Sequence, residues 1–95
     1  MKDQQLKGLT FLGSWVAAEN QRQLDKWGIQ EHSGCEWLTI TAEEFGEMAK
    51  AILEHHFANG NPREVVIEAI QTATLCLKIA EMYLVECETK EKVKG

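Results

Sequence analysis

The stretch AEEFGEMAKAILE, residues 42–54, decides the fold of this chain. Its apolar residues recur at helical spacing, and Glu44 and Glu47 lie one turn apart on a shared helix face. Two carboxylates at that spacing repel each other, so they are either solvated by water or bridged by a cation. A bridging cation needs oxygen ligands from another part of the chain, because Mg²⁺ requires octahedral oxygen coordination.

A second polar pair lies on the next predicted helix. Glu68 and Gln71 have i, i+3 spacing, so two facing helices would each present a pair to one oxygen-lined site. The alternative is a solvated acidic face, which is the commoner environment of such pairs. Gly46 favours the site, because glycine inside a helix costs about 1 kcal/mol relative to alanine and lets a neighbour or ligand approach closely.

Composition limits the classes of protein to which the chain can belong. Its 95 residues predict one small domain, residues 1–95, whose core is marginal for a monomer, so we expect oligomerisation. The formal net charge of −5, without a basic stripe, argues against nucleic-acid binding. There is no leader and no long uncharged apolar run, which predicts a cytoplasmic protein without membrane contact. Three cysteines without metal-binding spacing are expected to be reduced thiols, with Cys76 in the core.

The first predicted helix spans about residues 6–27 and ends at Gly28. Gly8 and Gly13 weaken its beginning, so residues 1–13 are expected to fray. Four apolar residues mark its buried side: Trp15, Val16, Leu24 and Trp27. Arg22 and Lys26 place two cations on one face at i, i+4, where they are either solvated or positioned to neutralise a phosphate.

Capping signals delimit the next two helices. Ser33 and Glu36 match a capping box, which predicts a second helix from about residue 35 to 57 or 58. Gly60 is expected to end it, Asn61 to cap the third helix, and Pro62 to occupy the first position of the third helix. The third helix should run to about residue 87, with residues 88–95 frayed. The short turn makes the two helices antiparallel neighbours.

Apolar stripes predict how these helices pack. The second helix carries a predicted core stripe of Leu38, Thr41, Phe45, Met48 and Ile52. The third helix carries two seams, one of Val66, Ile70, Ala73, Leu77, Ala80 and Leu84, the other of Val65, Ala69, Thr72, Cys76, Ile79 and Tyr83. Two seams on one helix mean burial from two sides, so one seam should pack within the protomer and the other against a second copy.

The acidic motifs resemble a known family. The segment EEFGE at 43–47, followed by EAIQ at 68–71, resembles the E-E-x-x-E…E-x-x-D signature of the MazG-like, all-α nucleoside triphosphate pyrophosphohydrolases. The similarity also includes residues 21–28, His32, residues 37–38 and residues 70–75, and it covers most of the chain, roughly residues 19–81. It implies an all-α fold, a MazG-like antiparallel helical bundle completed by dimerisation, as a homodimer or a dimer of dimers.

The resemblance also implies an activity, the hydrolysis of an NTP or dNTP to the monophosphate and pyrophosphate with Mg²⁺ or Mn²⁺. Carried over by position, Glu44, Glu47, Glu68 and Gln71 would hold the metal. Glu43 would be a supporting carboxylate or would orient water, which makes Glu43, Glu44 and Glu47 the catalytic set.

The same resemblance suggests how the substrate is held. Arg22 and Lys26 would bind phosphate oxygens, and Trp27 or Trp37 would stack on the base. The alternative role for both tryptophans is packing in the core.

Gln71 departs from the family pattern, which has aspartate at this position. Its amide can offer a carbonyl oxygen but contributes no charge, so it should bind Mg²⁺ more weakly. The alternative function is therefore a catalytically weak or inactive MazG-like helical dimer that binds a nucleotide or a protein partner.

Overall fold

The computed structural model describes residues 6–94, with side chains up to Lys90, and this part of the chain is almost entirely helical. It contains α1 (Leu9–Trp27), α2 (Gly34–Ala58) and α3 (Pro62–Lys94), and no strand. The predicted all-α class is confirmed. Residues 1–5 and 95, for which fraying was predicted, lie outside the described range.

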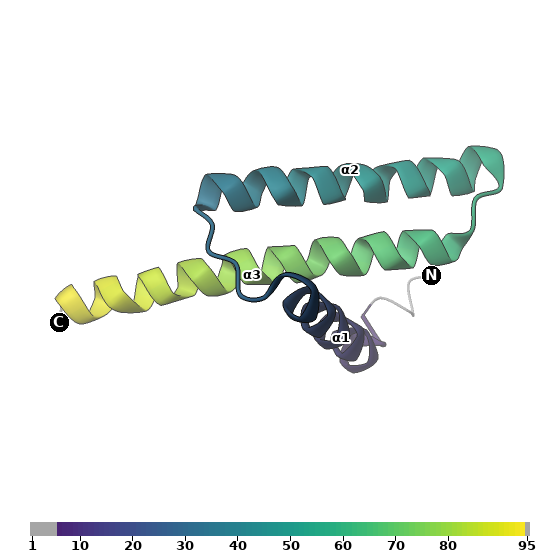
Figure 1. Ribbon diagram of the computed structural model, residues 1–95. Helices are drawn as coiled ribbons and strands as arrows, with labels where there is room; N and C mark the ends of the chain where they lie inside the picture. Colours follow the sequence, from purple (N-terminus) through teal and green to yellow (C-terminus); the bar gives the residue numbers. More distant parts are fainter. Residues whose placement is uncertain (1–5, 95) are drawn as a thin grey trace.

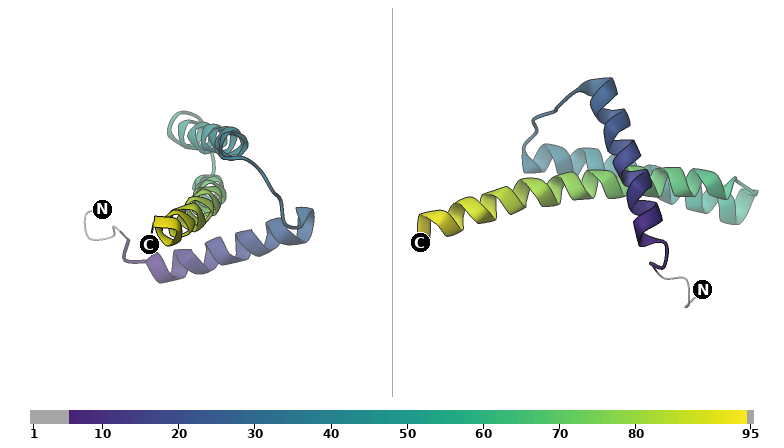
Figure 2. Two further views of the ribbon diagram at one scale, coloured as in Figure 1. Left: turned by 90° about the vertical axis from the view of Figure 1, so that its left-hand side faces the viewer. Right: turned by 90° about the horizontal axis from the view of Figure 1, so that it is seen from below.

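Helix α3 lies between the other two helices. Figure 1 shows α2 and α3 side by side and antiparallel, as predicted, and Figure 2 shows α1 crossing α3 on the side opposite α2. The C-terminal part of α3 extends beyond the start of α2, which makes the molecule 54 Å long. No helix among residues 6–94 combines the length and apolar character needed to cross a bilayer.

The predicted capping box at the start of α2 is confirmed. The backbone N–H of Glu36 donates to Ser33 Oγ at 3.2 Å, and the backbone N–H of Ser33 donates to Glu36 Oε1 at 2.8 Å. The next residue, Gly34, allows close contact with α3, because a Cβ there would lie 2.0 Å from the Tyr83 hydroxyl. The start of α2 is thus fixed both locally and by packing.

The turn between α2 and α3 differs from the prediction in one residue. Asn59, with φ of 56°, adopts the left-handed conformation that ends α2, which was expected of Gly60. Asn61 caps α3 as predicted, since its Oδ1 accepts from the backbone N–H of Arg63 at 2.9 Å, and Pro62 is the first residue of α3. Helix α3 continues to Lys94, beyond the predicted end near residue 87.

The prediction for α1 was wrong in two respects. The helix is continuous across Gly13, and the predicted buried residues Trp15 and Trp27 are 41% and 51% exposed. The buried residue of α1 is Gln23, at 7% exposure. Because α1 crosses α3 at a steep angle, only a short segment of α1 touches its neighbour, and a polar side chain occupies that contact (Figure 2).

Three of the five residues in the predicted apolar stripe of α2 lie outside the interior of the single chain, whereas Thr41 and Met48 are half-buried. Leu38, Phe45 and Ile52 are 64%, 58% and 45% exposed. The residues of α2 that face the interior are at positions 37, 44 and 51, one residue before Leu38, Phe45 and Ile52, and we call these positions the inward line of α2. Trp37 and Ala51 on this line are buried. A shift of one residue is a rotation of about 100°, so the apolar stripe lies on the flank of α2.

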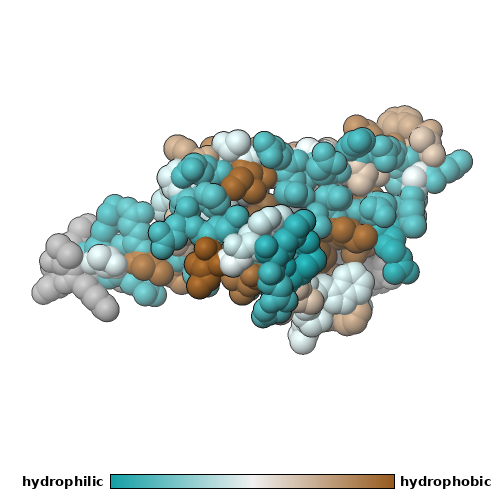
Figure 3. Space-filling view, viewed as in Figure 1, coloured by the Kyte–Doolittle hydropathy of each residue, from teal (hydrophilic) through white to brown (hydrophobic). Residues whose placement is uncertain are grey.

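The interior of α3 is similarly mixed. Its buried residues are Thr72, Thr74 and Leu75, whereas Cys76, predicted in the core, is exposed, as is Leu77. The hydroxyls of the two threonines donate to backbone carbonyls four residues earlier, at 2.8 Å each, so their burial leaves no unpaired hydroxyl. Figure 3 shows brown apolar residues among the hydrophilic ones on the surface of the molecule.

Candidate metal and nucleotide site

Helices α2 and α3 bring three of the predicted ligands together. With its amide nitrogen directed at them, Gln71 donates to Glu44 Oε2 at 3.2 Å and to Glu68 Oε2 at 3.1 Å. Glu44 is on the inward line of α2, and Glu68 and Gln71 are on the side of α3 that faces it. All three side chains are half-buried. We refer to them as the acidic cluster.

The carboxylates of the acidic cluster repel each other. The pKa of Glu68 is raised by burial first, then by a hydrogen bond shared with Glu44 and by the charges of Glu44, Glu47 and Glu64. The charge of Glu47 therefore acts on the cluster, although its side chain is exposed. A concentration of negative charge of this kind attracts protons or cations.

The oxygen donors of the acidic cluster fit Mg²⁺, with one condition. Between residues 6 and 90, no three side chains of His, Cys, Asp or Glu are grouped closely enough to hold a metal, so Gln71 is needed as a ligand. Rotating its amide by 180° places Oε1 where the nitrogen is, 3.2 and 3.1 Å from Glu44 Oε2 and Glu68 Oε2. Adjacent oxygens of an octahedral Mg²⁺ shell are about 2.9 Å apart, close to these separations.

Gln71 thus has two possible roles in the acidic cluster. Its nitrogen links the two carboxylates without a metal, and its oxygen completes an oxygen triad with one. An aspartate at this position would only add repulsion in the metal-free protein. Glutamine at this position therefore stabilises the metal-free cluster more than aspartate would, and attracts a cation less strongly.

A cavity of about 200 Å³ adjoins the acidic cluster. Its walls include Glu44 and Gln71, together with three of the residues predicted to bind substrate, Arg22, Trp27 and Trp37. Trp37 is 6% exposed, whereas Trp27 presents half of its surface to solvent. The cavity thus places a cationic group and two aromatic rings beside the carboxylates.

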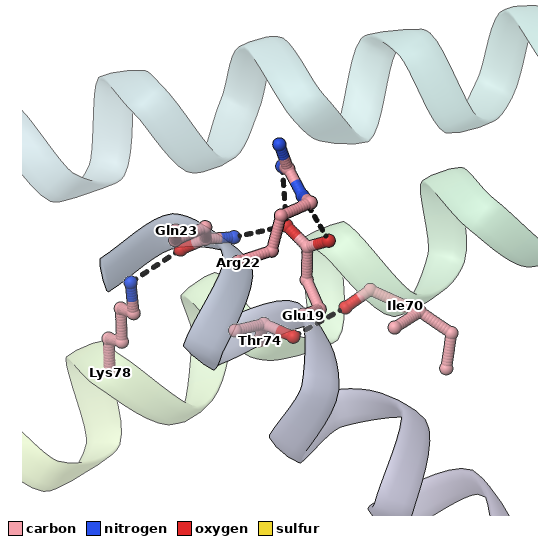
Figure 4. A network of polar contacts seen from close by, with 6 residues as sticks. All are labelled: Glu19, Arg22, Gln23, Ile70, Thr74 and Lys78. Atoms are coloured by element: carbon pink, nitrogen blue, oxygen red, sulfur yellow. Dashed lines mark hydrogen bonds and ion pairs between the residues drawn. The ribbon is translucent and has the colours of Figure 1, made fainter. Parts of the chain in front are cut away.

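Arg22 is already paired in this cavity. Its Nε and one terminal nitrogen each donate to the Glu19 carboxylate at 2.8 Å, and this pairing lowers the pKa of Glu19 (Figure 4). The hydrogen bond to Glu19 also raises the pKa of Arg22, and the charge of Glu44 acts in the same direction. Glu19 therefore orients the guanidinium beside Glu44.

The polar network continues into the interior. Gln23 donates to Glu19 Oε2 at 2.7 Å and accepts a hydrogen bond from the Lys78 ammonium on α3 (Figure 4). Sequence reasoning did not assign roles to Glu19, Gln23 or Lys78. The i, i+3 and i, i+4 spacings of Glu19 with Arg22 and Gln23 were a readable signal, but the contact with Lys78 depends on the crossing of α1 and α3.

Two predicted residues lie outside this arrangement. Glu43 is one residue before the inward line of α2 and is exposed, and its side chain makes no hydrogen bond or ion pair with any residue from 6 to 90. Lys26 is also exposed, with its Nζ 4.6 Å from the centre of the Trp27 ring. Gly46 was expected to allow close approach, but a Cβ added there would meet no atom within 4 Å beyond its own helix and immediate neighbours.

Comparison of the chain with protein-family profiles, curated proteins and solved structures gives no match.

Proposed function

We propose that the protein is a Mg²⁺-dependent nucleoside triphosphate pyrophosphohydrolase, converting an NTP or dNTP and water to the monophosphate and pyrophosphate. The observation that carries this proposal is the meeting of Glu44 and Glu68 at Gln71, beside a cavity lined by Arg22 and Trp37. This combination offers oxygen ligands, a cation for phosphate and an aromatic wall in one place.

In this proposal each residue has a separate task. Glu44, Glu68 and the oxygen of Gln71 hold the metal, with the charge of Glu47 strengthening its attraction. When bound, Mg²⁺ neutralises phosphate oxygens and activates water. Arg22, oriented by Glu19, binds an oxygen of the phosphate chain. The buried ring of Trp37 forms one wall of the smaller cavity and limits the access of water to the phosphate chain through that wall.

The proposal includes a second copy of the chain, as expected of a MazG-like bundle completed by dimerisation. The single chain exposes 7707 Å². A compact monomer of 10.8 kDa is expected to expose about 5,500 Å². The exposed area of the single chain thus exceeds that of a compact monomer by more than the roughly 800 Å² that each partner contributes to a standard interface. This extra area is large enough to form an interface with a second copy.

A turnover assay tests the catalytic proposal. Pyrophosphate release is measured with a panel of NTPs and dNTPs, with Mg²⁺ or Mn²⁺, for the wild type, Glu44→Gln and the control Glu54→Gln. Glu54 is an exposed glutamate of the same helix, outside the acidic cluster. We expect Glu44→Gln to lose at least about 100-fold in rate, since losing even an outer partner of a metal ligand costs 10- to 100-fold.

Equal background release by all three proteins would refute the catalytic proposal. The rival function is a non-catalytic dimer that binds nucleotide, and Gln71 favours it because the amide satisfies the carboxylates without metal. Calorimetry separates the two. Tight nucleotide binding without divalent metal, followed by no turnover, would establish the rival.

A further inference from the structure

A second and larger cavity of about 560 Å³ lies between the end of α1, the connection 28–33 and the C-terminal half of α3. Its walls include Leu24, His32, Trp37, Lys78, Met82 and Val85. Small-molecule sites typically measure about 300–1,000 Å³, so this cavity is large enough for an organic ligand and the 200 Å³ cavity beside the acidic cluster is not.

The two cavities are neighbours. Trp37 and Gln30 line both of them, and Gln23, which lines the smaller cavity, is hydrogen-bonded to Lys78, which lines the larger one. The two cavities thus share a wall, so a ligand that occupied both would pass Trp37 and Gln30 between its phosphate chain and its other end.

Lys78 is the cationic hydrogen-bond donor of the larger cavity. Its ammonium is half-buried, donates to Gln23 and lies 5.8 Å from the centre of the Trp37 ring. Burial lowers its pKa, while the charge of Glu19 acts in the opposite direction. An ammonium has three donors, and an oxygen acceptor in the cavity would compensate for its loss of water.

The remaining walls suit a flat ring. His32 packs edge-on against Trp37, with 4.8 Å between the ring centres, and the two rings form an aromatic wall. Leu24, Met82 and Val85 are apolar. Polar side chains also line the cavity, namely Asn20, Gln30, Glu31 and Glu81. Among them Lys78 is the cationic donor, beside aromatic and aliphatic surface.

We propose that this cavity binds the nucleoside half of the substrate and that Lys78 donates a hydrogen bond to a ring carbonyl oxygen of the base. This inference rests on the proposed function. Uracil, thymine, cytosine and guanine carry such an oxygen, and adenine does not. The protein should therefore discriminate against adenine nucleotides. A hydrogen bond to a charged group is worth about 1.5–3 kcal/mol, which corresponds to about 10- to 100-fold in affinity.

The experiment uses nucleosides without phosphate, so that base recognition is measured separately from hydrolysis. Binding of cytidine, uridine and adenosine is followed by tryptophan fluorescence for the wild type, Lys78→Met, Lys78→Arg and the control Lys50→Met. Lys50 is an exposed lysine of α2. Circular dichroism and thermal unfolding verify that each variant is folded.

We expect the wild type and Lys50→Met to bind cytidine and uridine at least tenfold more tightly than adenosine. Lys78→Met should lose this preference, and Lys78→Arg should retain part of it. Equal affinity for all three nucleosides, or an unchanged preference in a folded Lys78→Met, would overturn the inference. Competition by inorganic phosphate that depends on Lys78 would also overturn it, since the ammonium would then bind phosphate.

The two proposals can fail separately. Turnover of NTPs by a wild type that binds no nucleoside would overturn the base cavity and leave the hydrolase standing. Base-selective binding that depends on Lys78, without any turnover, would support the cavity and refute the catalytic proposal.

Discussion

At the scale of single residues, Glu68 carries a charge that the fold disfavours. The raised pKa means that the folded protein holds a proton on Glu68 at a pH where the unfolded chain has released it. Stability from this group is therefore present below the ordinary pKa of 4.5 and is lost as the pH rises through the raised value. A bound cation would offset that loss at neutral pH.

Glu68→Gln should consequently stabilise the metal-free protein at pH 7 while removing its response to Mg²⁺. Urea unfolding in EDTA should give a higher midpoint for this variant than for the wild type, with the difference disappearing below about pH 4. Mg²⁺ should raise the midpoint of the wild type only. Glu54→Gln serves as the control and should follow the wild type throughout. A lower midpoint for Glu68→Gln at pH 7 would contradict this account.

At the scale of the helices, the two glycines of α2 have opposite surroundings. Gly46 faces open space, since an added Cβ would contact nothing within 4 Å beyond its local helix. A Cβ at Gly34 would collide with the Tyr83 hydroxyl at 2.0 Å. Helix propensity therefore decides the effect of alanine at the first position, and packing against α3 decides it at the second.

We expect Gly46→Ala to raise the free energy of unfolding by about 0.5–1 kcal/mol. Gly34→Ala should lower it by about 1 kcal/mol or less, because the half-exposed Tyr83 side chain must move away from the added Cβ. Tyr83→Phe removes the colliding oxygen and should restore part of the loss in the double variant. Chemical denaturation of the four proteins measures these values. Destabilisation by Gly46→Ala would indicate that a partner or ligand approaches this position.

At the scale of the whole molecule, several of the exposed apolar residues lie on one side of the α2–α3 pair. We define the apolar face as Leu38, Phe45, Ile52, Cys76, Ala80, Tyr83 and Leu84, all of which are exposed or half-exposed. In α2 these residues follow the inward positions 37, 44 and 51 by one residue. In α3, Cys76 and Tyr83 likewise follow Leu75 and Met82, which line cavities together with residues of α2. Because α2 and α3 are antiparallel, the same sense of rotation leads to the same side of the pair. Glu43 and Glu47 lie on the opposite flank of α2, so a second copy on the apolar face would leave the acidic cluster accessible.

Phe45→Glu should therefore dissociate the dimer, because it would place a charge inside the interface. Phe57→Glu is the control, since Phe57 is also on α2 and 77% exposed but lies off the apolar face. Sedimentation should show a dimer for the wild type and Phe57→Glu, and a monomer for Phe45→Glu. The thiol of Cys76 in the wild type should also react more slowly with an alkylating reagent as the protein concentration rises. A wild type that stays monomeric at high concentration would refute the dimer.

The sequence by itself determined the all-helical class, the starts of α2 and α3 and the spacing of the polar pair on α3. Capping at Ser33 and at Asn61-Pro62 depends on residues a few positions apart, so the starts of α2 and α3 could be predicted from the order of residues. The same holds for the i, i+3 spacing of Glu68 and Gln71. Such features arise from interactions within one or two helical turns.

Only the tertiary structure decided which face of each helix is covered. Periodicity identified the apolar stripe of Leu38, Phe45 and Ile52, but a rotation of one residue sets whether α3 covers it, and that rotation depends on packing between helices. The pairing of Gln23 with Lys78 likewise required α1 to cross α3, 55 residues away in the chain. Contacts between distant residues follow from how whole helices pack, and a local pattern does not contain that information.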